Sequence, residues 1–194
     1  LDRRDDVGHR ARERRIEHDA HVVRVVGRAP GGAPRVAAVV GRERWVRLRR
    51  VGARARQAGH PVVFTGRNAA LIDTVAAQTG AHGLVADSSV DADNARTVET
   101  CLAKLGGIDV LINNAAFGYI AEIGELDVDK MRALFATNVF GVVDLTNRVV
   151  PLMKKQSGGD IVNLASTSGM KGGKGGTAYG GSKWAIRGIT QCWQ

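Results

Sequence analysis

A chain of 194 residues can bury one full apolar core, so we expect a single domain rather than two. The net charge of +9 suggests a polyanion binder, but residues 1–67 hold 17 arginines, no lysine and 7 acidic residues, while the rest holds 11 basic and 12 acidic residues. We find neither a long apolar run nor a secretory signal, and therefore expect no membrane span and a cytoplasmic location.

Apolar runs and helical periodicities alternate from residue 61 onward, which is the pattern of a parallel sheet covered by helices. We expect one long helix to bend near Pro151. In chain order, the predicted strands cover 36–40, 62–65, 82–86, 108–112 and 159–165, and the predicted helices cover 69–78, 91–105, 127–155 and 177–191.

The start of the chain has a different composition. Residues 1–34 are rich in arginine and include the segment Gly-Arg-Ala-Pro-Gly-Gly-Ala-Pro. We therefore predict that 1–34 is disordered or not genuine sequence, and that residues 35–194 form the domain. The two cysteines, Cys101 and Cys192, are far apart and match no metal or redox spacing, so we expect two inert thiols and no metal site.

Tyr179 and Lys183 lie four residues apart near the start of the last predicted helix. This spacing puts both side chains on one helical face, one turn apart. A neighbouring ammonium group favours the phenolate form of a tyrosine, so Tyr179 could act as a general acid toward a carbonyl or a general base toward an alcohol. The spacing alone is weak evidence, because surface helices often contain it by chance.

Three further features precede this pair. Ser166 follows an apolar strand, thirteen residues before Tyr179, where its hydroxyl could hydrogen-bond a substrate oxygen. Asn113-Asn114-Ala115-Ala116 ends an earlier strand, and Asn138 lies on the long helix. In this order the features resemble the short-chain dehydrogenase/reductase family, with its Asn-Ser-Tyr-Lys catalytic set and its Asn-Asn-Ala-Gly strand end. Within that family, the chain resembles the 3-oxoacyl-thioester and sugar-alcohol reductases.

The resemblance implies an α/β fold with a Rossmann-like, doubly wound parallel sheet in three αβα layers. It makes Tyr179 the proton donor or acceptor, and Lys183 the group that favours its phenolate and holds the nicotinamide ribose. Ser166 would orient the substrate carbonyl, and Asn138 would hold a water that links Lys183 to solvent. Two alternatives stay open. Ser168 could replace Ser166, and Asn138 could merely satisfy backbone groups at a break in its helix.

The resemblance also implies how the cofactor is chosen. At the end of the second parallel strand of such folds, an acid binds the ribose 2′-hydroxyl of NAD and a base binds the 2′-phosphate of NADP. Arg67 stands there, which favours NADP over NAD; a solvated loop arginine is the alternative. Ala116 replaces the usual Gly and could crowd the cofactor slightly. The implied cofactor-binding residues are Arg67, Asn68, Asp87, Ser88, Asn114, Ala115, Ala116, Tyr179 and Lys183.

The glycine-rich pyrophosphate loop of the family is missing. After Gly41, Trp45, Val46 and Arg47 stand where small residues are needed. Permissible codons for residues 41–49, read one nucleotide later, give Gly-Ala-Ser-Gly-Gly-Phe-Gly-Tyr-Ala, which restores the loop. We therefore predict a frameshift here, and a chain that as written neither binds NADP tightly nor turns over.

The resemblance further predicts a C-terminal truncation, because family members continue with two more strands. We expect a complete protein to form a homodimer or homotetramer and to act on a small carbonyl or alcohol substrate by hydride transfer. Two other functions stay open, namely an inactive reductase-like scaffold and an Arg-rich arm that binds nucleic acid on such a scaffold. Acids are mixed among the arginines and aromatic residues do not alternate with them, so we do not expect nucleic-acid binding.

Overall fold

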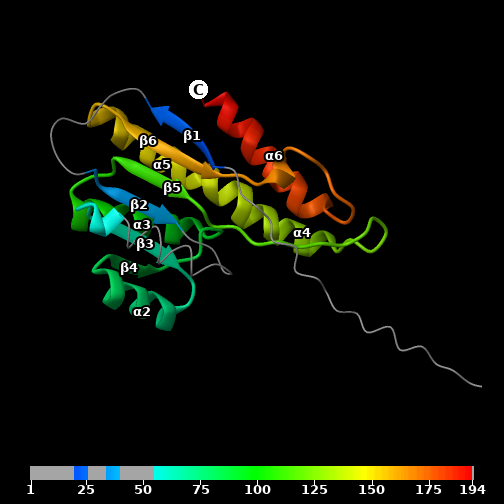
Figure 1. The fold of residues 1–194 in the computed structure, drawn as a ribbon, viewed down its shortest axis with the longest axis horizontal. Helices are drawn as coiled ribbons and strands as arrows, with labels where there is room; N and C mark the ends of the chain where they lie inside the picture. The colour runs from blue at the N-terminus through cyan, green and yellow to red at the C-terminus, as the bar shows by residue number, and fades with distance from the viewer. Residues whose placement is uncertain (1–19, 26–33, 40–54, 194) are drawn as a thin grey trace, which may run out of the picture.

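The computed structural model describes residues 20–25, 34–39 and 55–193. Within these ranges a six-stranded sheet runs in the order β1-β6-β5-β2-β3-β4 (Figure 1). Strands β2 to β6 are parallel, and the chain order reverses between β2 and β5. The strands are β1 (Ala20–Val25), β2 (Val36–Val39), β3 (Val62–Gly66), β4 (His82–Val85), β5 (Val110–Asn113) and β6 (Gly159–Leu164).

Helices cover both faces of the sheet. They are α2 (Ala69–Thr79), α3 (Asp91–Leu105), α4 (Val128–Phe135), the π-helical η1 (Ala136–Phe140), α5 (Gly141–Lys155), the 3₁₀-helical η2 (Thr167–Gly169) and α6 (Thr177–Cys192). Among the described helices, α2 packs on one face, and α3, α5 and α6 pack on the other. The predicted Rossmann-like fold in three layers is confirmed. No helix in the described ranges has both the length and the apolar character that a membrane crossing needs.

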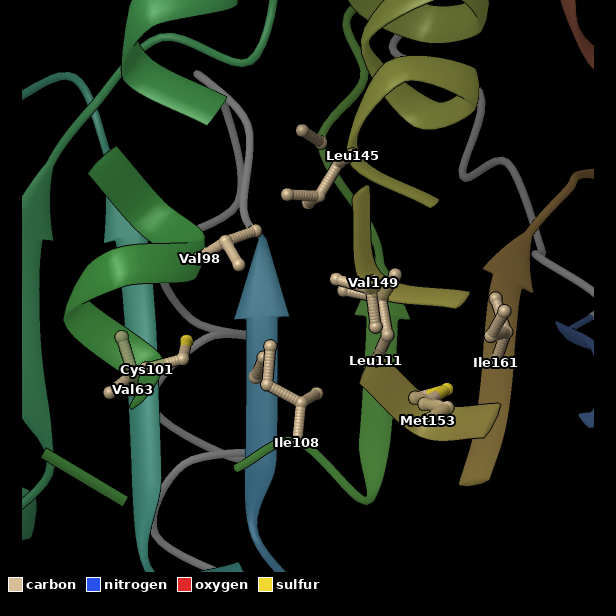
Figure 2. Close-up of a cluster of buried hydrophobic side chains, with 11 residues drawn as sticks. Val63, Val98, Cys101, Ile108, Leu111, Leu145, Val149, Met153 and Ile161 are labelled. Atoms are coloured by element: carbon tan, nitrogen blue, oxygen red, sulfur yellow. The ribbon is translucent and has the colours of Figure 1, made fainter. Parts of the chain in front are cut away.

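The larger apolar cluster fills the space between the sheet and the helices α3 and α5 (Figure 2). Successive residues of a strand point to opposite faces, so Val63 joins this cluster while Val62 and Phe64 pack toward α2. Cys101 of α3 is fully buried, and burial raises the pKa of its thiol to about 12, so it packs as a small apolar side chain. Cys192 is exposed.

The long helix predicted over 127–155 is interrupted by a π-helical turn at Asn138. It begins after Asp127, whose carboxylate accepts hydrogen bonds from the backbone N–H groups of Asp129 and Lys130. The interruption is the π-helical turn η1, whereas Pro151 lies inside α5 without ending it. The π turn surrounds Asn138, and such turns are frequent at functional sites. The bend near Pro151 stays a prediction.

Strand β1 was not predicted from the sequence. It pairs antiparallel with β6, from Ala20 opposite Leu164 to Val25 opposite Gly159, and lies at one edge of the sheet (Figure 1). Its β-branched valines suit a strand. Residues 20–25 belong to the segment 1–34 that we expected to lie outside the domain, and most of the rest of that segment lies outside the described residues. The division of the chain at residue 34 stays a prediction.

Helix α5 begins in close contact with the loop that follows β4. Gly141 has no side chain, and a Cβ atom there would overlap the backbone carbonyl of Ser88. The same carbonyl accepts a hydrogen bond of 3.0 Å from the amide of Asn94, which is buried and also donates to Asp144 at 2.8 Å. These contacts fix the loop that carries Asp87 and Ser88, two of the predicted cofactor-binding residues.

We expect Gly141→Ala to lower the free energy of unfolding by about 1–3 kcal/mol, because α5 or the Ser88 loop would have to shift. Gly188→Ala is the matched control, since Gly188 lies on an exposed face of α6 with open space around its Cβ position. That control should be neutral or stabilising by up to about 1 kcal/mol. Urea unfolding followed by circular dichroism measures both, and equal stabilities of the two variants would contradict the close contact.

Candidate functional site

The predicted site residues follow the carboxyl ends of the parallel strands, which share one edge of the sheet. Arg67 follows β3, Asp87 follows β4, Asn114 follows β5 and Ser166 follows β6. Ligands of such sheets bind in the crevice outside this edge, where the strand order reverses. Gly41, Trp45, Val46 and Arg47, at the expected pyrophosphate loop, lie outside the described residues.

Tyr179 and Lys183 are both buried on the first turns of α6. The Lys183 amine lies 5.9 Å from the centroid of the Tyr179 ring and donates a 2.9 Å hydrogen bond to the carbonyl of Leu164, the last residue of β6. Burial lowers the pKa of Lys183 to about 8. At neutral pH the amine is therefore still mostly protonated, and its charge is buried beside the tyrosine ring.

Ser166 is buried at the end of β6, where it caps the short helix η2. Its Oγ accepts a hydrogen bond of 3.2 Å from the backbone N–H of Ser168, which is itself partly exposed. Helix η2 packs directly against α6, since a Cβ atom on Gly169 would lie 2.8 Å from the carbonyl oxygen of Lys183. Ser166 thus lies between Leu164 and Gly169, which both contact Lys183 of α6. The choice of Ser166 over Ser168 as the residue that orients the substrate stays a prediction.

Asn138 lies in the π turn and is almost wholly buried. Its side-chain oxygen accepts from the N–H of Phe117 at 3.0 Å, and its Nδ2 donates to the carbonyl of Phe117 at 3.0 Å. The break in the helix that we considered is present, but the backbone groups that Asn138 satisfies belong to the loop after β5. A Cβ atom on the next residue, Gly118, would lie 4.0 Å from the Tyr179 ring, so this loop borders the site.

Sequence reasoning missed Ser182, which connects Asn138 to the tyrosine helix. Asn138 Nδ2 also donates to Ser182 Oγ at 3.1 Å, and Ser182 Oγ donates to the backbone carbonyl of Tyr179 at 2.7 Å. Ser182 is fully buried. Its place three residues after Tyr179 and directly before Lys183 was the available signal, because side chains three apart share a helical face.

A buried polar network lies beneath the site and was also missed. Asn113 at the end of β5 donates to Thr146 of α5 at 3.1 Å and to Asn163 of β6 at 2.8 Å. Asn163 in turn donates to Thr190 of α6 at 2.9 Å. Because buried amides are costly to leave unpaired, these bonds hold two strands and two helices in one arrangement.

The predicted adenosine side of the site contains an ion pair. Arg67 Nη1 lies 2.9 Å from Asp87 Oδ2, so the arginine expected to bind a phosphate already has an acidic partner. Burial acts to raise the pKa of Asp87, but hydrogen bonds from Ser89 and the pairing with Arg67 outweigh it and hold that pKa below its ordinary value. Asn68 caps α2 by accepting from the N–H of Leu71 at 3.0 Å.

The strand end after β5 is partly open. Asn114 and Ala116 are partly exposed, whereas Ala115 packs into the large apolar cluster. Within the described ranges, no group of three His, Cys, Asp or Glu residues is placed to hold a metal ion.

Comparison with known proteins decides the family. The family model of the short chain dehydrogenases matches residues 49–194. The chain belongs to the short-chain dehydrogenase family. An uncharacterized oxidoreductase of Staphylococcus saprophyticus is 37% identical over 139 residues, which are 69% of this chain and 59% of that protein. The chain therefore spans about three fifths of this short-chain dehydrogenase relative.

Two reductases extend the comparison within the family. The 3-oxoacyl-[acyl-carrier-protein] reductase of Thermotoga maritima is 40% identical over 96 residues, which are 50% of this chain and 39% of that protein. The crystal structure of a 3-ketoacyl-(acyl-carrier-protein) reductase from Brucella melitensis complexed with NADH has a TM-score of 0.72 and 25% identity. That likeness covers 83% of this chain and 69% of the Brucella chain.

Buried Lys183 should make stability depend on pH in this short-chain dehydrogenase. Its pKa is about 8 in the folded state and 10.5 in the unfolded chain, so between these values the unfolded state binds more protons and stability rises with pH. Relative to Lys183→Met, the wild-type free energy of unfolding should increase by about 3 kcal/mol from below pH 8 to above pH 10.5. Urea titrations across this range measure the difference.

The control for this titration is Lys104→Met, which removes an exposed lysine on α3. The difference between wild type and Lys104→Met should stay flat over the same pH range. A flat difference for Lys183→Met as well would contradict the burial of the amine.

Proposed function

We propose that this short-chain dehydrogenase is an NADP-dependent oxidoreductase that interconverts a carbonyl and a secondary alcohol by hydride transfer. The buried pair on α6 supports this most strongly. The Lys183 amine lies 5.9 Å from the centre of the Tyr179 ring and contacts the last residue of β6. A protonated amine beside a tyrosine supports proton transfer at neutral pH. Ser166 and Asn138 surround this pair from neighbouring elements.

The described residues suit both ends of a nicotinamide dinucleotide phosphate. Arg67 offers the planar guanidinium that pairs with a 2′-phosphate, and Asp87 with the Ser88 amide offers partners for adenine. Asn114 to Ala116 would line the path between the two ends, with Lys183 at the nicotinamide ribose. The bound dinucleotide would supply the hydride for reduction and accept it for oxidation. These residues therefore fit a bound NADP.

The proton chemistry would belong to the chain's own side chains. In reduction, Tyr179 Oη donates a proton to the carbonyl oxygen, and in oxidation it takes the proton from the alcohol. The Lys183 charge favours the tyrosinate that remains after donation. Ser166 Oγ donates a hydrogen bond to the same substrate oxygen and orients the carbonyl. Asn138 would hold the water that reconnects Lys183 with solvent.

The named relatives support a class of substrate. The Thermotoga maritima and Brucella melitensis proteins are named as reductases of 3-oxoacyl or 3-ketoacyl groups on acyl carrier protein. We extend this to a small 3-oxoacyl thioester as the substrate of the present chain. The Brucella protein is complexed with NADH, so the choice of NADP here depends on Arg67. A cytoplasmic location and a homodimer or homotetramer are part of the same proposal.

An inactive reductase-like scaffold is the second candidate. It is favoured by the sequence after Gly41, where Trp45 and Arg47 replace the small residues of the pyrophosphate loop. The family match begins only at residue 49, after this segment. Reduction by the full chain distinguishes the two candidates directly.

In a frame-corrected, full-length protein, Tyr179→Phe should lower the rate of NADPH oxidation with a 3-oxoacyl thioester by about 10²–10⁴-fold, since the general acid is lost while the cofactor contacts remain. The Kd for NADPH, measured by calorimetry, should hardly change. Lys183→Ala should both lower the rate and weaken NADPH binding, because Lys183 would also bind the ribose.

Tyr119→Phe is the matched control for this experiment. Tyr119 packs against the apolar cluster that contains Tyr179, and its Oη accepts a hydrogen bond from the N–H of Asp127 at 2.9 Å. Tyr119→Phe keeps the ring and removes only the hydroxyl, so turnover should stay nearly intact. If Tyr179→Phe were as active as the unsubstituted protein, Tyr179 would not be the general acid. A wild-type chain that binds NADPH and reduces no carbonyl compound would support the inactive scaffold instead.

A further inference from the structure

The ion pair between Arg67 and Asp87 joins the ends of two neighbouring strands. Gly66 of β3 lies opposite Val85 of β4 in the parallel ladder, so both loops leave the sheet side by side. Arg67 Nη1 and Asp87 Oδ2 are 2.9 Å apart, and both side chains are about a quarter to a third exposed. This is the place where the 2′ position of an adenosine ribose is distinguished in folds of this kind.

The carboxylate is the fixed partner of the pair. Asp87 Oδ1 accepts hydrogen bonds from the Ser89 backbone N–H at 3.0 Å and from Ser89 Oγ at 2.7 Å. The backbone N–H of Asp87 donates to Asp93 at 2.7 Å, and Asp93 is itself paired with Arg96 at 2.8 Å. Asp87 is thus held from its own loop, and a phosphate that recruits the guanidinium of Arg67 must draw it away from Asp87 or share it.

The charge of the pair differs from that of a lone arginine. A 2′-phosphate would meet a guanidinium that is already neutralised, together with a carboxylate that repels it. A 2′-hydroxyl could instead donate a hydrogen bond to that carboxylate. A partly exposed ion pair is weak, so a phosphate can displace it, but at a cost in affinity.

We propose that Asp87 is a specificity-determining residue that competes with the 2′-phosphate for Arg67 and so weakens the preference for NADP over NAD. The inference rests on the proposed function, because it concerns the same nucleotide site. It assigns Asp87 a role in the choice of cofactor, in addition to the adenine contact proposed above.

The test measures binding by the full chain of 2′,5′-ADP and 5′-AMP, the adenosine halves of NADP and NAD, and of NADPH and NADH. Calorimetry gives the Kd values without turnover. In Asp87→Asn, which keeps the shape of the side chain and removes its charge, the selectivity for 2′,5′-ADP over 5′-AMP should rise about three- to tenfold. The ratio for NADPH over NADH should rise in the same direction.

Two further variants separate the pairing from a general change of charge. Asp73→Asn removes an exposed acid on α2 and should leave the selectivity unchanged. In an Arg67→Gln background, Asp87→Asn should raise the selectivity by less than it does when Arg67 is present, because only the repulsion between the carboxylate and the phosphate then remains.

An unchanged ratio in Asp87→Asn would overturn this inference, as would an equal rise in Asp73→Asn. In either case nucleotide binding by the wild type would leave the proposed function standing. If neither the wild type nor any variant bound any of the four nucleotides, the proposed function and this inference would both be overturned.

Discussion

The backbone contact between η2 and α6 is the interaction on which the candidate site depends. Gly169 lies so close to Lys183 that a Cβ atom at position 169 would be only 2.8 Å from the carbonyl oxygen of Lys183. Because the two backbones touch, the Lys183 amine reaches the carbonyl of Leu164, and Ser166 is enclosed between them. A bulkier residue at position 169 would push α6 away and separate the residues assigned to proton transfer.

The remaining framework holds α6 from the other side. Asn138 links the loop after β5 to Ser182, and Ser182 bonds to the backbone of Tyr179. These hydrogen bonds stabilise the buried region, because leaving one amide unpaired there would cost about 1–3 kcal/mol. The end of the site with Tyr179 and Lys183, where we propose that the nicotinamide binds, is thus firmly held. The proposed adenosine end carries a partly exposed ion pair between Arg67 and Asp87 that a ligand can rearrange.

Much of the fold could be predicted, because strand alternation and helical periodicity are local patterns. The spacing of Tyr179 and Lys183 likewise predicted their common helical face. What the sequence did not reveal depends on partners distant in the chain. Strand β1 pairs with β6, more than a hundred residues later, and the periodicity of one strand says nothing about its neighbour. The pairing of Arg67 with Asp87, twenty residues away, and the π turn at Asn138 also arise from tertiary contacts.

We propose that Tyr179 faces a bound nicotinamide cofactor. The chain contains only two tyrosines, so a sample with ¹³C-labelled tyrosine rings gives two sets of ring signals, which Tyr119→Phe assigns. On addition of NADP⁺, the signals of Tyr179 should shift with saturation. Signals of Tyr179 that stay unchanged up to millimolar NADP⁺ and NAD⁺ would show that Tyr179 does not face a bound cofactor.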